Sequence, residues 1–558
     1  MFSRGVGVAV AAVATIAIGG VLWATSLTNP SAPLGASGSP SPTSSATRSP
    51  AQSSSPEPST SAPVPSPEPT AFAWEPSQAD WDQALAQARQ LTVEQAAGQA
   101  IVASYSGTSP TKLTAFIEAR DLGGVMLQGD ATKSKKVTES LTKAANTAGG
   151  DRDWPVMVAV DQEGGTVARL RGMIPGMPAF MAAGATTDKA AVHEAYADQG
   201  WYVRDMGFNT NFAPDADVTV GLSDPVIRSR SAGSDAQNVA ATVDAAVAGY
   251  TDAGVISTVK HFPGHGSVDV DSHKGLPVQA ATVAQLEKRD FVPFASAIDA
   301  GVPSVMVGHI ALHEWGDVPA SVAPAAYAYL RDDLGFTGVA ITDAMNMGAI
   351  VDQYEPGRAT VLALEAGADL VLMPADVDAA ISGIVAAVKS GELPRERLDE
   401  AVARSVLMMR WQAGLVPTST DAPPAHYARD FAARAVTVVT PTCSGELVSD
   451  TVTVTGGWEH ERTTLAAALA KRGIGAGDES HPGTTVRLAG NSSTEVEGDV
   501  VVALDGPWIL DKSKATTYIT LYGRSDDALE ALADILVGKV TSGSSWPVTL
   551  KNVPGKPC

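Results

Sequence analysis

Short apolar runs alternate along the chain with Ala-rich stretches of helical periodicity, beginning after Phe72. Uninterrupted apolar runs are typical of parallel strands that are buried on both faces and covered by helices. Helix signals lie between the runs, including the capping box Thr92-Val93-Glu94-Gln95 and Thr282 ahead of residues 283–290. The eight runs are residues 101–105, 124–128, 156–160, 208–212, 255–259, 304–307, 339–342 and 370–373.

Eight strand-and-helix repeats in about 340 residues predict an α/β fold of the (β/α)₈ TIM-barrel type. We place this barrel at residues 73–418. An open doubly wound sheet is the alternative, but no Gly-rich phosphate fingerprint follows an early strand. Beyond Pro424, strand-like runs alternate with helix-like segments at 463–472 and 528–537. They predict a smaller three-layer α/β domain over residues 425–558.

The N-terminal region predicts export. Arg4 precedes an uncharged, apolar run from Gly5 to Leu27, so residues 1–28 are a signal peptide or a signal anchor. The length favours a membrane anchor, whereas Ala24 and Ser26 offer a cleavage step. Residues 29–72 form a linker, because 23 of the 40 residues from 31 to 70 are Ser or Pro. Such a tether reaches on the order of 100 Å when it is extended.

Composition narrows the possible partners. The 558 residues carry 61 acidic and 39 basic side chains, a net charge of −22, which disfavours nucleic acid as a partner. Two cysteines are too few for a zinc or iron–sulfur cluster. We expect no cofactor. Cys443 and Cys558 both lie in the second domain, and an exported location permits a disulfide between them.

Polar residues follow five of the predicted barrel strands. In a barrel of this type the site is built from the loops at the carboxyl ends of the strands. Polar residues must follow any buried strand, but five loops that together carry Asp, His and Lys indicate a binding site. These loops are residues 161–165, 211–215, 260–266, 308–309 and 343–346.

The loop KHFPGHGSVDVDSHKGLP, residues 260–277, contains three histidines and two aspartates. Metal binding is disfavoured because Pro263, Gly264 and Gly266 prevent His261 and His265 from forming a helical pair of ligands. We therefore expect no metal. For His265, in a tight PGHG turn, a structural role is the better interpretation.

Acid/base chemistry is the remaining interpretation of this loop. Asp271 can reach the imidazole of His273 and fix its tautomer, and an oriented imidazole can protonate a leaving oxygen and then deprotonate water. Asp343, directly after the apolar run 339–342, is suited to be the nucleophile, because carboxylates commonly form covalent glycosyl intermediates.

The motifs KHFPGHG with DSH, DQEGG, IRSRSAG (227–233) and LGFTGVAITDAMNMGAI together resemble glycoside hydrolase family 3, in its β-N-acetylglucosaminidase branch. The resemblance covers residues 86–411 and continues more weakly beyond them. It implies a retaining barrel enzyme with Asp343 as nucleophile, His273 as acid/base and Asp271 orienting His273. It also implies a substrate-binding set of Asp161, Arg169, Arg230, Lys260 and His261.

Two departures from the family pattern affect these assignments. Related sequences tend to read IGDRSFG where this chain reads IRSRSAG, so the choice of Arg230 over Arg228 rests on aligning the Ser-x-Gly that follows. Around the nucleophile, Thr342-Asp343-Ala344-Met345 lacks the second carboxylate of the commoner Ser-Asp-Asp motif. The choice of Asp343 is thereby less ambiguous.

The resemblance predicts removal of terminal, non-reducing β-linked GlcNAc from peptidoglycan fragments or chitin oligomers. From the N-terminal segment we expect an extracellular enzyme, either secreted or anchored to the outer face of the cell membrane, and we expect it to be a monomer. A neutral imidazole places no second negative charge beside the nucleophile, so phosphate could approach and phosphorolysis is an alternative to hydrolysis. We expect hydrolysis, because an exported enzyme meets water in excess. The sequence also leaves open a β-glucosidase or β-xylosidase, a metal-dependent deacetylase or amidase, and a non-catalytic wall-binding protein.

Overall fold

The computed structural model describes residues 74–150, 152–478, 480–539 and 543–558. The predicted signal or anchor segment and the linker therefore lie outside the described residues. Within the described part, no helix combines the length and apolar character needed to cross a bilayer.

Eight parallel strands form the first sheet, and each predicted apolar run overlaps one of them. Their order in the sheet is β11-β9-β7-β6-β3-β2-β1-β12. A parallel bridge from Ile341 to Leu370 joins the two ends of this order, so the sheet closes into a barrel. The strands are β1 (Ile101–Tyr105), β2 (Gly124–Leu127), β3 (Met157–Val160), β6 (Thr210–Asn211), β7 (Ile256–Phe262), β9 (Ser304–Val307), β11 (Val339–Thr342) and β12 (Val371–Leu372).

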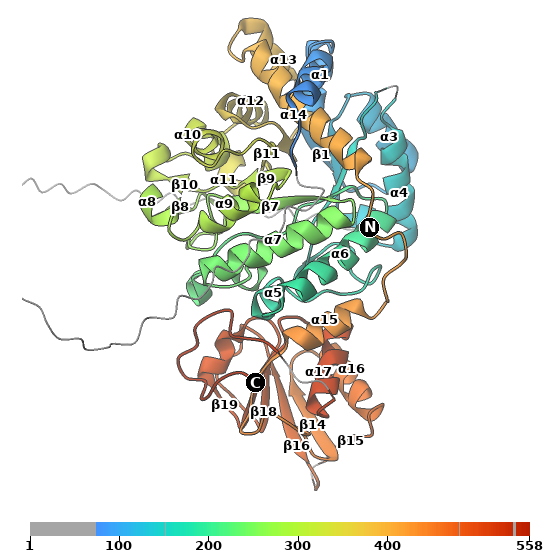
Figure 1. The fold of residues 1–558 in the computed structure, drawn as a ribbon, viewed down its shortest axis with the longest axis vertical. Coiled ribbons are helices and arrows are strands. Elements are labelled where there is room, and N and C mark those ends of the chain that lie inside the picture. Colours follow the sequence, from blue (N-terminus) through green and yellow to red (C-terminus); the bar gives the residue numbers. More distant parts are fainter. Residues whose placement is uncertain (1–73, 151, 479, 540–542) are drawn as a thin grey trace, which may run out of the picture. The chain divides into compact units, whose positions relative to one another are not determined.

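Helices follow these strands and surround the barrel, as Figure 1 shows. The capping box at Thr92 is present, because its hydroxyl accepts from the Gln95 N–H while the Gln95 side chain accepts from the Thr92 N–H. After Thr282, α8 (Val283–Leu286) is shorter than predicted. The principal barrel helices are α1 (Gln78–Ala88), α2 (Val93–Gln99), α3 (Pro110–Glu118), α4 (Lys135–Thr147), α6 (Lys189–Asp205), α7 (Ala236–Asp252), α9 (Val292–Asp299), α10 (Pro324–Ala328), α12 (Pro356–Ala366), α13 (Val377–Ser390) and α14 (Arg395–Gly414).

The second domain contains a six-stranded sheet in the order β13-β20-β18-β16-β14-β15. One face is covered by α15 (Tyr427–Ala435), α16 (Glu459–Ala470) and α17 (Asp526–Leu536). The 3₁₀ helix η7 (Pro507–Lys512) contributes to the core on the other face. The strands are β13 (Thr437–Val439), β14 (Thr451–Gly456), β15 (Gly475–Ala476), β16 (Thr484–Ala489), β18 (Val500–Ala503) and β20 (Thr517–Thr520), and only β13 runs antiparallel to its neighbour.

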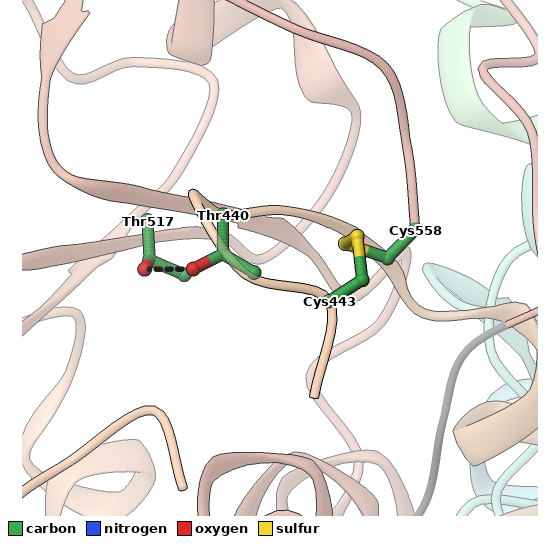
Figure 2. Close-up of a disulfide and its surroundings, with 4 residues drawn as sticks. All are labelled: Thr440, Cys443, Thr517 and Cys558. Atoms are coloured by element: carbon green, nitrogen blue, oxygen red, sulfur yellow. Dashed lines mark hydrogen bonds between the residues drawn. A yellow bond between two sulfur atoms is a disulfide. The ribbon is translucent and has the colours of Figure 1, made fainter. Parts of the chain in front are cut away.

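A disulfide joins Cys443 to Cys558, the last residue of the chain (Figure 2). The Cys558 N–H also donates to the Val438 carbonyl at 2.8 Å. Beside this segment, the hydroxyls of Thr440 and Thr517 lie 3.0 Å apart and share a hydrogen bond. The C-terminus is thereby attached to the edge strand β13. The disulfide that an exported location permits is present.

A short hairpin and one extended strand shape the end of the barrel at which the strands finish. The hairpin of β4 (Gln162–Gly164) and β5 (Val167–Ala168) follows β3 directly. Strand β7 extends to Phe262, so Lys260 and His261 lie within a strand. The apolar pattern predicts instead that this strand ends at residue 259 and that both side chains lie on a loop. The extension carries them on a buried strand, which restricts their motion.

Candidate active site

A pocket of about 350 Å³ lies at the carboxyl ends of the barrel strands. Seven of the eight predicted site residues line it, and the eighth, Asp271, contacts one of the seven. The lining includes Asp161, Glu163, Arg169, Arg230, Lys260, His261, Ser272, His273 and Asp343. Residues separated by up to about 180 positions in the sequence therefore meet in one site, as a barrel requires.

Asp343 follows β11 directly and is only 9 % exposed. Its N–H donates to the Val307 carbonyl at 2.8 Å, which fixes the backbone against β9. Its Oδ1 accepts from the Ala344 N–H at 2.7 Å. Burial by itself would raise the pKa of Asp343, but His261, His309, this N–H and Lys260 together lower the pKa to about 2. The carboxylate is therefore ionised and available as a nucleophile at neutral pH.

His273 lies at the open side of the pocket, with 65 % of its side chain exposed. Its Nδ1 lies 2.9 Å from Asp271 Oδ1, and the same oxygen accepts from the His273 N–H at 3.0 Å. A carboxylate can only accept, so Nδ1 carries a proton and Nε2 is left for chemistry. Burial opposes ionisation of Asp271, but these hydrogen bonds from His273 hold the Asp271 pKa below its ordinary value.

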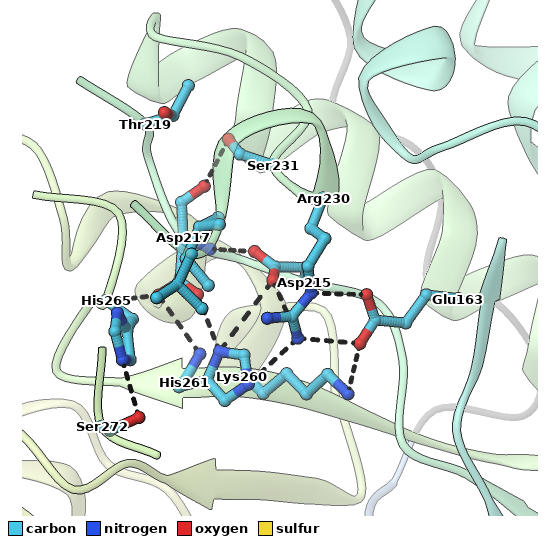
Figure 3. Close-up of polar contacts among 12 residues, drawn as sticks. Glu163, Asp215, Asp217, Thr219, Arg230, Ser231, Lys260, His261, His265 and Ser272 are labelled. Atoms are coloured by element: carbon cyan, nitrogen blue, oxygen red, sulfur yellow. Dashed lines mark hydrogen bonds and ion pairs between the residues drawn. The ribbon is translucent and has the colours of Figure 1, made fainter. Parts of the chain in front are cut away.

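Lys260 and Arg230 share a buried carboxylate that we did not single out from the sequence, that of Glu163. Arg230 donates to both Glu163 oxygens at 2.9 Å, and Lys260 Nζ lies 2.6 Å from Oε1. Lys260 Nζ also donates to Asp161 Oδ1 at 2.9 Å. Burial raises the Glu163 pKa, yet the two cations lower it well below the ordinary range. Figure 3 shows Glu163 between Arg230 and Lys260; these contacts fix the two cations in the pocket wall.

His261 is held by Asp217, another residue that we did not predict. His261 Nδ1 lies 2.8 Å from Asp217 Oδ2, and Asp217 Oδ1 accepts from the backbone N–H of both His261 and His265. Burial, followed by the nearby Arg230, lowers the His261 pKa to about 4, so its imidazole is neutral at neutral pH. Its Nε2 then faces Arg230 Nη2 at 3.3 Å.

Asp215 lies beside this pair and is fully buried. Burial and the neighbouring Asp217 raise its pKa well above the ordinary range. The possible ligand atoms of Asp215, Asp217 and His261 all lie within 4.8 Å of one another. The hydrogen bond between His261 and Asp217 accounts for their close approach, and acid/base chemistry at His273 and Asp343 needs none of the three as a metal ligand.

The segment that carries His273 is anchored from two sides. His265 Nε2 lies 3.0 Å from Ser272 Oγ, and the Ser272 carbonyl accepts from the Ala349 N–H at 3.1 Å. A Cβ on Gly348 would stand 2.7 Å from the His273 carbonyl oxygen, so the loop packs closely on the start of α11 (Gly348–Val351). His265 also lines the pocket, and its partner Ser272 is next to the acid/base candidate, so the predicted structural role of His265 stays a prediction.

The two arginines of the 227–233 segment, Arg228 and Arg230, make different contacts. Arg230 lines the pocket, whereas the Arg228 N–H and Nε both donate to Asp224. Arg169 also lines the pocket, from the end of the β4–β5 hairpin. The sequence signals that could have revealed the missed residues were present: Glu163 stands inside DQEGG, and Asp215 and Asp217 follow the fourth strand.

A buried ionised carboxylate at a barrel strand end, with an oriented imidazole on the same pocket, is an arrangement that can break a glycosidic bond through a covalent intermediate. The fold and the site together define a glycoside hydrolase.

Comparison with known proteins shows the family of this glycoside hydrolase. The family model "Glycosyl hydrolase family 3 N terminal domain" matches residues 85–408, and the chain belongs to glycosyl hydrolase family 3. It is 35% identical over 297 residues to "Beta-hexosaminidase LpqI" of Mycobacterium tuberculosis, covering 51% of this chain and 75% of that protein. It is 33% identical over 330 residues to "Beta-hexosaminidase A" of Pseudoalteromonas piscicida, covering 53% of this chain and 54% of that protein.

Among solved structures, a glycoside hydrolase family 3 beta-N-acetylglucosaminidase from Paenibacillus sp. str. FPU-7 is similar at 26% identity with a TM-score of 0.73. That likeness covers 83% of this chain and 100% of the other. It therefore extends beyond the family match into the second domain.

Proposed function

We propose that this protein is a retaining exo-β-N-acetylglucosaminidase that removes terminal, non-reducing β-linked GlcNAc. The observation that carries the proposal is that ionised Asp343 and the Asp271-oriented His273 line one pocket. The names of the relatives support the choice of sugar.

In the first step, a carboxylate oxygen of Asp343 attacks the anomeric carbon while the glycosidic oxygen leaves. The leaving oxygen takes the Nε2 proton of His273 in its imidazolium form, and a covalent glycosyl-enzyme results. In the second step, water attacks the anomeric carbon, Nε2 accepts the water proton, and Asp343 is released. Asp271 retains the Nδ1 hydrogen bond in both steps.

The other predicted residues have a binding role in this proposal. Asp161, Arg169, Arg230, Lys260 and His261 surround the same pocket and offer charged or polar groups to sugar hydroxyls. Because Glu163 and Asp217 fix Lys260, Arg230 and His261 before any sugar arrives, little conformational entropy is lost on binding.

We also propose that the enzyme works outside the cytoplasm on peptidoglycan fragments or chitin oligomers, secreted or held at the outer face of the membrane. The Cys443–Cys558 disulfide supports an oxidising compartment. The apolar N-terminal run supports export.

Turnover of aryl β-N-acetylglucosaminides tests the proposal. Asp343→Asn should lower kcat/KM by at least about 10³-fold, because the nucleophile is lost. His273→Ala should lower it about 10²- to 10⁴-fold, and less on leaving groups that need no protonation. His313→Ala, which removes an exposed histidine paired with Asp317 outside the pocket, is the matched control and should keep full activity.

The product released in phosphate buffer distinguishes hydrolysis from phosphorolysis, and the rates on different aryl glycosides identify the sugar. Free GlcNAc should dominate in phosphate buffer, whereas mostly GlcNAc-1-phosphate would show a phosphorylase. Faster cleavage of aryl glucosides or xylosides than of aryl N-acetylglucosaminides would contradict the proposed sugar. Equal turnover by His273→Ala and the parent would contradict the assigned acid/base.

A further inference from the structure

A second cleft, of about 470 Å³, lies beside the β4–β5 hairpin and between the barrel and the second domain. Its lining includes Ala168 and Arg171 from the barrel and Trp458 and Arg524 from the second domain. None of these four lines the catalytic pocket.

The hairpin separates the two cavities, because successive side chains of a strand point to opposite faces. Glu163, Val167 and Arg169 line the catalytic pocket. Gln162, Ala168 and Leu170 line the second cleft. A molecule in this cleft would therefore contact the back of the wall that carries the predicted sugar-binding residues.

Trp458 is the unusual residue of the cleft. It is 70 % exposed, and it is the only aromatic among the exposed large apolar side chains of the described residues. The guanidinium carbon of Arg524 lies 4.8 Å from the centre of the Trp458 ring, so one face of the ring is covered and the other is free. Exposed aromatic surface beside a cleft is characteristic of binding sites.

A network of polar contacts holds the backbone of Trp458 and the Arg524 guanidinium on which its ring packs. The backbone N–H of Trp458 donates to Glu461 Oε2 at 2.7 Å, and Arg524 Nη1 donates to Glu461 Oε1 at 2.6 Å. Arg524 also binds both oxygens of Asp505, at 2.6 and 2.9 Å. Glu461 is 1 % exposed. A ring that already packs on a fixed guanidinium loses less rotamer freedom when a ligand stacks on it than an unsupported ring would.

We propose that this cleft is a second saccharide-binding site, in which a pyranose ring stacks on the free face of Trp458. The C–H face of a pyranose is apolar and flat, so it fits an aromatic plane. The cleft rim supplies hydrogen-bonding groups for the hydroxyls from Arg171, His460 and Asp526.

Charge favours a neutral sugar over an anionic ligand. Arg524 is already paired with Asp505 and Glu461, and Asp526 and Asp527 also line the cleft. A phosphate or carboxylate would meet these acids, whereas hydroxyls can donate to them. The site would hold a glycan on the enzyme independently of cleavage, and it goes beyond the proposed function.

Binding of a β-1,4-linked GlcNAc tetramer to the Asp343→Asn chain tests the proposal, because this variant does not consume the tetramer. Isothermal titration should show two binding events for each chain. Adding Trp458→Ala should weaken one event about tenfold or more, while Trp458→Tyr, which keeps an aromatic plane, should retain most of it. Thermal unfolding checks that each variant is folded.

Trp201→Ala is the matched control, since Trp201 lies on α6 and lines neither cavity. It should leave both events unchanged. A tetramer titration in which Trp458→Ala weakens no binding event of the Asp343→Asn chain would overturn the proposal, whether that chain shows one event or two. Failure of the proposed function would appear instead in the aryl-glycoside assay, which does not use the tetramer.

Discussion

Asp343 and His273 are held in different ways, which suits their proposed roles. Asp343 is fixed at a buried strand end, and its low pKa follows from the two neighbouring histidines, Lys260 and a backbone N–H. His273 is exposed and depends on Asp271 and on the backbone of its loop. The contacts that anchor its loop should therefore affect the function of His273 more than that of Asp343.

Ser272→Ala tests this dependence by removing the side-chain contact with His265. We expect kcat to fall on the order of tenfold, as for loss of one buried hydrogen bond, because His273 is held less firmly while the sugar-binding wall is intact. KM should change much less, and Ser140→Ala on α4 serves as a distant control. An equal change in KM would indicate a binding role instead.

At the scale of elements, the closure between β11 and β12 depends on one buried carboxylate at the opposite end of the strands from the pocket. Asp369 Oδ2 accepts from the Ala340 N–H at 3.0 Å and from Arg331 at 2.6 Å. Its Oδ1 accepts from Arg397 and Arg404 of α14, at 3.1 and 3.3 Å. This clamp attaches α14 to the barrel seam.

Asp369→Asn should lower the free energy of unfolding by about 3 kcal/mol, because buried cations lose their counter-charge. Chemical denaturation checks this, and Asp378→Asn, at an exposed pair with Arg120, should change stability little. Activity of the folded variant at low temperature should persist, since Asp369 is outside the pocket. Loss of activity without loss of stability would contradict the clamp role.

We expect the free energy of unfolding to depend on pH through the same Asp369 carboxylate. Burial would raise the Asp369 pKa, but the three arginines lower it below its ordinary value. Its stabilising contribution is therefore complete above the ordinary carboxyl pKa and is lost as pH falls below that range. The Asp369→Asn variant should accordingly lose less stability on acidification than the parent.

At the scale of the whole molecule, the second domain supports the hairpin that walls the catalytic pocket. The Gly176 N–H donates to Asp527 at 2.9 Å, and Ser525 Oγ donates to the Gly176 carbonyl at 2.8 Å. The Ala179 N–H donates to the Tyr522 carbonyl at 2.7 Å. These contacts connect the segment after β5 to the turn that leads into α17.

Replacing Cys443 and Cys558 together by Ser should lower the stability of the second domain by up to about 4 kcal/mol, because the disulfide closes a loop with a sequence separation of 115. Thermal unfolding measures the loss. Thiol titration of the denatured, unreduced parent should detect no free thiol, and two thiols would show that the bond is absent.

The sequence by itself determined the barrel strands and which residues bring chemistry to their ends. Buried parallel strands leave uninterrupted apolar runs, and Asp343 and the Asp271–His273 pair follow from local order along the chain. The tertiary structure alone decided the partners of these residues: Glu163 pairs with Arg230 and Lys260, and Asp217 pairs with His261. The Asp217–His261 and Glu163–Arg230 contacts join residues 44 and 67 positions apart, and local pattern carries no information about which distant side chains share a buried space.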